Sequence, residues 1–251
     1  MRKVERLSAI LDRVSDSGNV DVVELAEVLG VSGATVRRDL QSLSTSGLLV
    51  RTHGGAVAND VGDELPVRMK AARRQSEKRR IGVAAAAMIP EGAVVGMTGG
   101  TTALELAREL RARRGITVVT NALDIAVELA GHSGIRLVVI GGIVRHSLEL
   151  VGPAAESMLS NYHLDIAFVG VDGLTVEDGC STYDEMEAQT DLAFLRRARR
   201  NVVIADSSKI GKVTFARIAG LDEVGELVTD RGADPAQLDA LRAAGVTVLT
   251  V

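Results

Sequence analysis

Aromatic residues are almost absent from this chain of 251 residues: it has no tryptophan, and aromatic side chains make up 2% of it. Recognition of single-stranded nucleic acid by stacked bases needs aromatic platforms, so the composition argues against that mode of binding. The hydrophobic fraction is nevertheless 46%. The core must therefore consist mainly of Val, Leu, Ile and Ala, which is typical of α/β proteins.

Cysteine is also scarce, because Cys180 is the only one in the sequence. A single cysteine excludes an intramolecular disulfide and argues against a cysteine-based zinc site, and we expect neither a metal nor a cofactor. The longest apolar run, near residues 81–90, is well short of the roughly 20 residues that cross a membrane. Charged residues near the N-terminus lead directly into an amphipathic helix, unlike a signal peptide. We therefore expect a cytoplasmic protein with no membrane partner.

An excess of positive charge is missing as well, since the formal net charge is -4 at pH 7. Averaged over the whole chain, such a balance argues against a DNA-binding protein. The charges are distributed unevenly, however, because Arg37, Arg38 and Arg51 cluster while many acidic residues precede them. The local field near these arginines favours phosphate, and specific, dimeric contacts would have to supply the remaining affinity.

The N-terminal segment has the pattern of a helix-turn-helix. Residues 22–29 carry apolar side chains at helical spacing, and Gly30-Val31-Ser32 ends that helix. Ser32 is a suitable N-cap for a second helix, because its hydroxyl can accept a hydrogen bond from a backbone N–H of the first turn. On that helix Thr35, Arg37 and Arg38 face outward, where they can contact phosphates and base edges in a major groove.

Residues 47–56 resemble a small β-wing, with an apolar strand, then Arg51 and His53, then paired glycines that let the backbone turn. Together with an amphipathic helix that precedes the motif, they predict a winged helix-turn-helix domain over residues 1–57. The candidate DNA-binding residues are Ser32, Thr35, Arg37, Arg38, Arg51 and His53. Two alternatives stay open. Arg37 and Arg38 can be the solvated face of an ordinary helical hairpin, and His53 can be a residue that shapes the wing without contacting DNA.

Residues 58–75 are expected to connect this domain to a second one over residues 76–251. The stretch from Val67 to Arg80 is strongly basic, and we favour a solvated helix face over additional phosphate contacts as its interpretation. Short apolar strands then alternate with helices, which predicts an open, mostly parallel α/β sheet covered by helices on both faces. The expected strands cover residues 93–97, 117–120, 136–140, 166–170, 202–205, 227–229 and 246–249.

Polar loops follow successive strands, at the sheet edge where ligands of α/β proteins bind. The loop Thr98-Gly99-Gly100-Thr101-Thr102 opens a helix, so its N–H groups, hydroxyls and helix N-terminus form an anion cradle. An amide, two carboxylates and an ammonium follow on other loops. Such a set suits a small polyhydroxylated phosphate ester. The candidate ligand-binding residues are Gly99, Gly100, Thr101, Thr102, Asn121, Asp172, Glu185 and Lys209.

Each of these features also has a purely structural interpretation. The glycine loop can be a tight connection, Asp172 a turn residue before Gly173, and Glu185 a first-turn acid favoured by the helix dipole. Because polar loops recur at successive strand ends, we favour a binding site over these separate explanations.

The sequence resembles the DeoR family of bacterial transcriptional regulators over nearly its whole length. The motifs that carry the resemblance are Leu29-Gly30-Val31-Ser32, Thr35-Val36-Arg37-Arg38-Asp39-Leu40, Arg51-Thr52-His53-Gly54-Gly55-Ala56, Thr98-Gly99-Gly100-Thr101-Thr102, Phe168-Val169-Gly170-Val171-Asp172-Gly173 and Ala205-Asp206-Ser207-Ser208-Lys209-Ile210-Gly211. The resemblance implies a C-terminal sensor domain similar in fold to ribose-5-phosphate isomerase. Members of the family typically respond to phosphorylated sugars. The resemblance also implies a repressor of a sugar-utilisation operon, which binds double-stranded operator DNA as a homo-oligomer and leaves it when a phosphorylated sugar effector binds. Thr98 departs from the pattern, because many members have Asp there.

Two rival functions follow from the same resemblance. The first is a sugar-phosphate isomerase fused to a DNA-binding domain, which would need a positioned carboxylate base. The isomerases carry an Asp-Gly-Ala-Asp segment, whereas this chain has Asp172-Gly173-Leu174-Thr175 without the second Asp, so we expect binding without catalysis. The second is an architectural DNA-binding protein whose other domain binds nothing.

Overall fold

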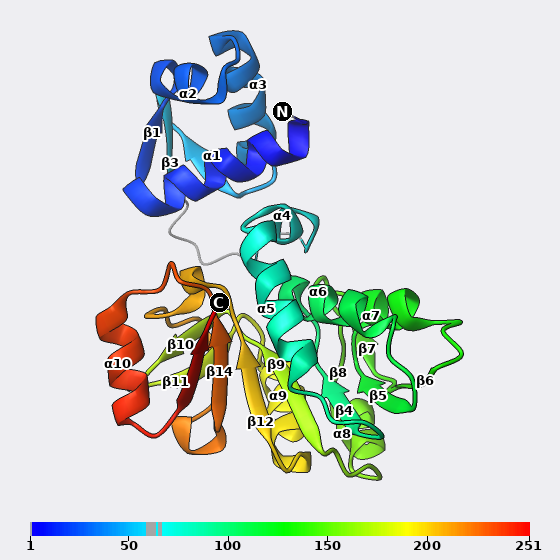
Figure 1. The fold of residues 1–251 in the computed structure, drawn as a ribbon. Coiled ribbons are helices and arrows are strands. Elements are labelled where there is room, and N and C mark those ends of the chain that lie inside the picture. Colours follow the sequence, from blue (N-terminus) through cyan, green and yellow to red (C-terminus); the bar gives the residue numbers. More distant parts are fainter. Residues whose placement is uncertain (1, 59–63, 65–66) are drawn as a thin grey trace. The chain divides into compact units, whose positions relative to one another are not determined.

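The computed structural model describes residues 2–58, 64 and 67–251, and these form two compact units, Met1–Arg73 and Arg74–Val251 (Figure 1). The boundary falls inside the segment 58–75 that was expected to be a connector. Within that segment, residues 59–63 and 65–66 lie outside the described residues, while Val67–Ala72 form helix α4. Over the described ranges, no helix is both long and apolar enough to span a bilayer.

The N-terminal unit packs three helices against a small antiparallel sheet. Its helices are α1 (Lys3–Ser17), α2 (Val22–Leu29) and α3 (Gly33–Thr45), and its strands are β1 (Asn19–Asp21), β2 (Leu49–Arg51) and β3 (Gly55–Ala58), in the order β1-β3-β2. The inner helix faces meet in a core that includes Ile10, Leu25 and Leu40, each fully buried. The winged helix-turn-helix architecture predicted from the sequence is therefore present, with β1 as an additional strand.

A seven-stranded sheet forms the centre of the C-terminal unit, in the order β15-β14-β12-β9-β4-β5-β6 with parallel pairing throughout. Its strands are β4 (Val94–Met97), β5 (Ile116–Thr120), β6 (Ile135–Val139), β9 (Ile166–Gly170), β12 (Asn201–Ile204), β14 (Glu226–Thr229) and β15 (Thr247–Thr250). Each expected strand matches one of these to within one residue at either end. The predicted parallel α/β sheet is confirmed, because strands buried on both faces are recognisable as short, continuous apolar runs.

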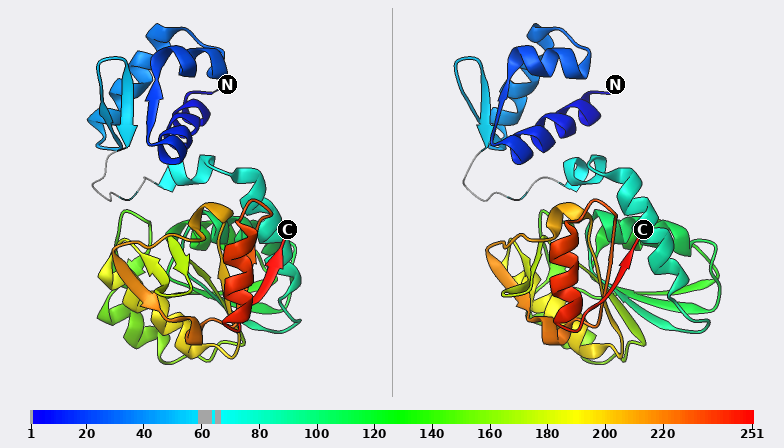
Figure 2. Two further views of the ribbon diagram at one scale, coloured as in Figure 1. Left: turned by 90° about the vertical axis from the view of Figure 1, so that its left-hand side faces the viewer. Right: turned by 60° about the vertical axis from the view of Figure 1, so that its left-hand side comes forward.

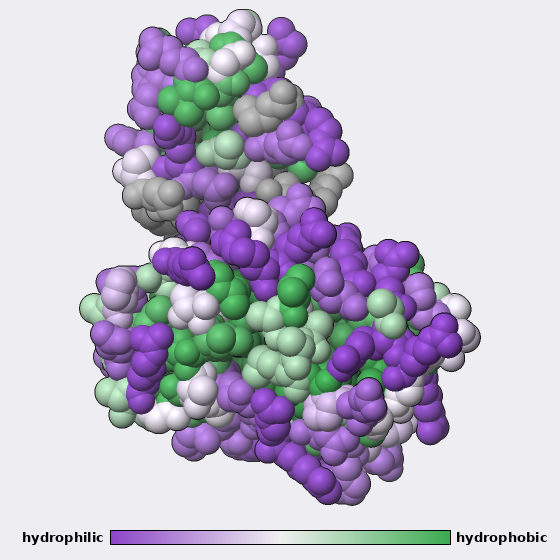
Figure 3. All heavy atoms as spheres, viewed as in Figure 1, coloured by the Kyte–Doolittle hydropathy of each residue, from purple (hydrophilic) through white to green (hydrophobic). Residues whose placement is uncertain are grey.

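Helices cover both faces of this sheet (Figure 2). One face packs against α5 (Gln75–Ala87), α6 (Thr101–Leu110) and α7 (Leu123–Leu129), and the other against α8 (Pro153–Leu159), α9 (Glu185–Arg197) and α10 (Pro235–Ala243). The two faces carry separate apolar clusters, with Phe168 in one and Phe194 in the other. In Figure 3, a broad apolar area lies across the middle of the viewed face of this unit, between α10 and α5, and hydrophilic residues surround it.

Shorter strands, which the sequence did not predict, flank the main sheet. The hairpin of β7 (Ile143–Val144) and β8 (Leu150–Val151) follows β6, and the strands β10 (Gly173–Thr175), β11 (Gly179–Thr182) and β13 (Ala216–Ala219) form a separate antiparallel sheet. β7 and β8 have two residues each, and β10, β11 and β13 carry Gly, Ser, Thr or Arg within three or four residues. None of them therefore has the nearly all-apolar run by which the strands of the main sheet are recognised. They matter here because they carry several side chains of the site described below.

Candidate functional site

The second helix of the helix-turn-helix, α3, is capped as the sequence predicts. Ser32 Oγ accepts a hydrogen bond from the backbone N–H of Thr35 at 3.3 Å, and the two hydroxyl oxygens lie 3.0 Å apart. Arg37 and Arg38 are exposed on this helix, and no carboxylate among the described residues forms an ion pair with either. Two unneutralised guanidinium groups beside a helix N-terminus are a suitable surface for the DNA backbone or for guanine edges.

A buried ion pair holds the opposite face of α3. Arg6 Nε donates to Asp39 Oδ2 at 2.5 Å, and Asp39 is only 3% exposed. The hydrogen bond from Arg6 to Asp39 raises the pKa of the Arg6 guanidinium, which is therefore charged at neutral pH. Because it joins α1 to α3, it fixes the orientation of the helix that presents Arg37 and Arg38. Sequence reasoning missed it, since Arg6 and Asp39 lie far apart in the chain.

The wing presents Arg51 and His53 differently. Arg51 Nη1 donates to Gln41 Oε1 at 2.7 Å, which ties the wing to α3, while His53 is exposed in a bend. The structure explains why residue 55 is glycine, because a Cβ atom there would lie 1.8 Å from the carbonyl oxygen of Val20. At least one of the paired glycines is thus required by the pairing of β1 with β3.

In the C-terminal unit, the predicted anion cradle joins the end of β4 to the start of α6. Thr98 Oγ1 accepts from the backbone N–H of Gly170 at 3.0 Å, which fastens the loop to the end of the neighbouring strand β9. Gly100 has φ +104 at the N-cap of α6, a backbone conformation that favours glycine. Thr101 and Thr102 are buried in the first helical turn.

Glu149, from the β7–β8 hairpin, lies directly against this loop. A Cβ atom on Gly99 would lie 2.4 Å from Glu149 Cγ, so any larger residue there would displace the Glu149 side chain. Asn121 Nδ2 donates to Glu149 Oε2 at 3.0 Å, while the buried Asn121 Oδ1 has no hydrogen-bond partner among the described residues. The structure thus brings Asn121 and Gly99 together, through a carboxylate that the sequence did not reveal.

Lys209 and Asp172 form a second part of the site. Lys209 Nζ donates to Asp172 Oδ1 at 2.7 Å, and both side chains are largely buried. Gly170, two residues before Asp172, lies against Gly99, since a Cβ on Gly170 would be 2.8 Å from the Gly99 carbonyl oxygen. The loops that follow β4 and β9 are therefore adjacent, as expected for neighbouring parallel strands.

Glu185 does not lie where the sequence analysis expected it. It is exposed on the first turn of α9, whereas Glu187 points inward and accepts hydrogen bonds from Ser147 Oγ at 3.1 Å and Thr182 Oγ1 at 2.8 Å. Helical rotation explains the difference, because two positions along a helix turn a side chain to the other face. The first-turn acid favoured by the helix dipole is the better description of Glu185.

Asp191 follows Glu187 by one helical turn and is 2% exposed. Burial, and then repulsion from Glu149, Glu187 and Asp172, raises the pKa of the Asp191 carboxyl well above its usual value of 3.8. This site therefore gathers carboxyl groups from several loops, with Lys209 and Arg145 as cationic neighbours; Arg145 Nε lies 3.6 Å from Glu187 Oε2. Carboxylates and an amide are the groups that proteins use to bind sugar hydroxyls, and a lysine can bind a phosphate.

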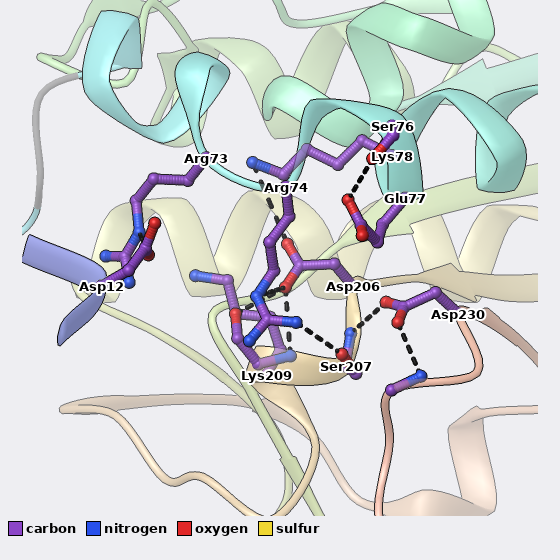
Figure 4. A network of polar contacts seen from close by, with 12 residues as sticks. Asp12, Arg73, Arg74, Ser76, Glu77, Lys78, Asp206, Ser207, Lys209 and Asp230 are labelled. Atoms are coloured by element: carbon purple, nitrogen blue, oxygen red, sulfur yellow. Dashed lines mark hydrogen bonds and ion pairs between the residues drawn. The ribbon is translucent and has the colours of Figure 1, made fainter. Parts of the chain in front are cut away.

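The basic stretch 67–80 is not simply a solvated helix face, and that preferred interpretation is wrong for four of its described members. Lys70 Nζ lies 3.0 Å from Glu64 Oε1, and both side chains are largely buried. Arg73 forms an ion pair with Asp12 on α1, within the N-terminal unit. Arg74 and Lys78 point to Asp206, which belongs to the same loop as Lys209 (Figure 4). Lys78 is only 5% exposed, because it packs under this loop at the start of α5.

Two domain families match this chain. Residues 6–61 match a DeoR-like helix-turn-helix domain, and residues 73–231 match the DeoR C-terminal sensor domain. A winged helix-turn-helix joined to a sensor domain defines the class as a DNA-binding transcriptional regulator. The chain belongs to the DeoR family.

Relatives of established name are transcriptional regulators and align over almost the whole chain. The HTH-type transcriptional regulator GlpR of Haloferax volcanii is 37% identical, covering 99% of this chain and 98% of the relative. The HTH-type transcriptional repressor GlcR of Bacillus subtilis is 33% identical over 99% of this chain and 96% of its own. The transcriptional repressor AccR of Agrobacterium fabrum is 34% identical over 91% and 90%.

Sequence identity to solved structures is lower. Ribose 5-phosphate isomerase A from Methanocaldococcus jannaschii aligns over 54% of each chain, with 20% identity and a TM-score of 0.41. The sorbitol operon regulator SorC from Klebsiella pneumoniae aligns over 96% of this chain and 99% of its own, with 14% identity and a TM-score of 0.42.

Proposed function

We propose that this chain is a cytoplasmic repressor of a sugar-utilisation operon. It is a homo-oligomer, and each copy binds double-stranded operator DNA through a DNA-binding domain over residues 1–57. A phosphorylated sugar binds the domain over residues 76–251, and this binding releases the protein from the DNA. Paired copies would place two recognition helices on repeated half-sites, which gives the affinity that a single small domain lacks. The repressors GlcR and AccR among the relatives support the sign of regulation.

The arrangement of the C-terminal site carries the proposal for the effector. The glycine loop at a helix N-terminus and Lys209 are groups suited to a phosphate, and Asn121, Glu149 and Asp172 supply acceptors suited to hydroxyls. Asn121 Oδ1, buried without a hydrogen-bond partner among the described residues, supports a ligand that donates hydrogen bonds.

Operator release in solution tests this proposal. DNA from upstream of the chain's own gene is labelled, bound to the protein, and titrated with glucose 6-phosphate, fructose 1-phosphate, fructose 6-phosphate, ribose 5-phosphate and glycerol 3-phosphate, each beside its unphosphorylated parent. We expect release by a phosphate ester and not by its parent compound. If every compound leaves the complex intact, the proposed effector class is wrong.

A matched pair of variants assigns the release to the site. Lys209→Ala should still bind operator DNA but need a much higher concentration of the phosphate for release. Lys212→Ala removes the same charge from an exposed position three residues further on and should behave as the wild type. Equal release of both variants would place the effector elsewhere.

Isomerase activity is the alternative function. The Asp172–Lys209 pair favours it, because a carboxylate beside an ammonium could serve as general base and general acid towards a bound sugar. Incubation of the purified chain with ribose 5-phosphate, followed by assay for ribulose 5-phosphate, distinguishes the two. We expect no turnover, and turnover abolished by Asp172→Asn would favour the enzyme.

A further inference from the structure

Two consecutive arginines lie at the junction of the two compact units, and each is bound within its own unit. Arg73, the last residue of the N-terminal unit, forms an ion pair with Asp12 on α1. Arg74, the first residue of the C-terminal unit, donates from Nη1 to Ser207 Oγ at 3.0 Å, and its Nε lies 3.9 Å from Asp206 Oδ1 (Figure 4). A single peptide bond therefore separates an anchor on the DNA-binding unit from an anchor on the ligand-binding unit.

The backbone at this junction has an unusual conformation. Arg74 has φ 49 and ψ 39, in the left-handed region, and it directly precedes α5. Residues other than glycine rarely adopt this region, and they keep it where surrounding contacts hold them there. The contacts of Arg74 with Asp206 and Ser207 are the side-chain interactions that supply this restraint.

Asp206 is the centre of these contacts. It is 3% exposed, and its Oδ2 lies 3.9 Å from Lys78 Nζ on the first turn of α5. Burial alone would raise the pKa of the Asp206 carboxyl, but Lys78, hydrogen bonds from Ser208 and the charge of Lys209 together lower it. Asp206 is therefore ionised at neutral pH, and it binds both Arg74 and Lys78 as a charged group.

The same residue also shapes the turn that carries Lys209. Asp206 Oδ1 accepts from the backbone N–H of Ser208 at 3.1 Å, and the Asp206 carbonyl accepts from the backbone N–H of Lys209 at 3.0 Å. Ser207, whose hydroxyl holds Arg74, lies in that same short helical turn, Ser207–Lys209. In a turn this short, the backbone of Lys209 cannot shift without also moving Asp206 and Ser207.

From this geometry we propose that Asp206 couples the effector site to the Arg73–Arg74 junction. A phosphate that binds Lys209 competes with Asp172 for the ammonium and shifts the turn, and this loosens the hold of Asp206 and Ser207 on Arg74. The contacts of Arg74 favour the DNA-binding arrangement, and their loss favours release. This coupling rests on the proposed function and names the residues through which the effector acts; Asp206 and Arg74 are positioning residues in it.

Thermodynamic linkage between the operator site and the effector site predicts a pair of affinity changes that a simple structural defect would not produce. If breaking the contacts of Arg74 shifts the protein towards the released form, operator affinity falls and affinity for the effector rises, because the two sites are thermodynamically reciprocal. Allosteric couplings are typically worth roughly 5-fold to 150-fold in affinity. A variant that merely damages the fold loses affinity for both ligands.

The test uses Arg74→Gly, since glycine adopts φ 49 without strain and removes the guanidinium. Operator affinity is measured without effector, and effector affinity is measured by calorimetry with whichever phosphate named above releases the wild type. We expect operator binding to weaken at least fivefold and effector binding to tighten. Asp206→Asn, which weakens the same contacts from the other side, should change operator affinity in the same direction.

Arg79→Ala is the matched control, because it removes an exposed arginine from the same helix, α5. It should leave both affinities as in the wild type. Wild-type affinities in Arg74→Gly, or a loss of both affinities together, would overturn the coupling while leaving the proposed function intact. If no phosphate releases the wild type, the proposed function itself fails, and the coupling fails with it.

Discussion

Replacing Arg37 and Arg38 together by alanine tests the assignment of the DNA-binding surface. Both side chains are exposed and, among the described residues, form no ion pair, so their removal should change the stability of the fold by no more than about 0.5 kcal/mol. Each arginine that binds a guanine edge contributes about 1–3 kcal/mol of discrimination. The double variant should therefore lose about 2–6 kcal/mol of operator binding per recognition helix, which is roughly a 30-fold to 20,000-fold loss of affinity.

Fluorescence anisotropy with labelled operator DNA measures this loss directly, and a salt series distinguishes phosphate binding from base recognition. If the arginines bind phosphates instead of bases, the slope of log affinity against log salt falls by about 0.9 for each phosphate that the variant no longer neutralises. The double replacement of Lys3 and Arg13 by alanine removes the same charge from α1 and serves as control. Equal operator affinity in the two double variants would refute the placement of α3 in the groove.

Three further variants test other parts of the structure. Arg6→Ala leaves Asp39 buried without its cation, so chemical denaturation of the N-terminal unit should show a loss of about 3–5 kcal/mol, and an unchanged midpoint would mean that the pair is unimportant. Gly99→Ala forces a methyl group against Glu149, so effector-induced release should be lost while operator binding persists; normal release would contradict the cradle. The raised pKa of Asp191 means that its contribution to stability is present below pH 3.8 and declines as the pH rises towards the folded-state pKa. Asp191→Asn should therefore flatten the dependence of Tm on pH above that value, and a parallel curve would show that Asp191 is ionised in the fold.

The main architecture was predictable because its signals are local. Each strand of the parallel sheet is a short apolar run, and α3 is marked by its Ser32 cap and by the spacing of its apolar residues. The glycine loop after β4 was recognisable for the same reason. Local patterns of this kind are independent of what lies across the fold.

The missing parts of the site depend on interactions between distant segments. Glu149 lies in a hairpin whose two-residue strands give no periodic signal, yet its side chain occupies the space beside Gly99. Glu187 was not recognised, because the first turn of α9 has acidic residues at positions 185 and 187, and only the packing of the helix shows which of them points inward. Arg74 and Lys78 were assigned to a solvated face because their partner, Asp206, is far away in sequence.

Operator occupancy during a titration with a phosphorylated sugar tests the central claim most directly. A single phosphate ester should displace wild-type protein from its operator, its unphosphorylated parent should not, and Lys209→Ala should resist displacement. Displacement by the parent sugar at the same concentration, or no displacement by any phosphate ester, would contradict the assignment of this site to a phosphorylated effector.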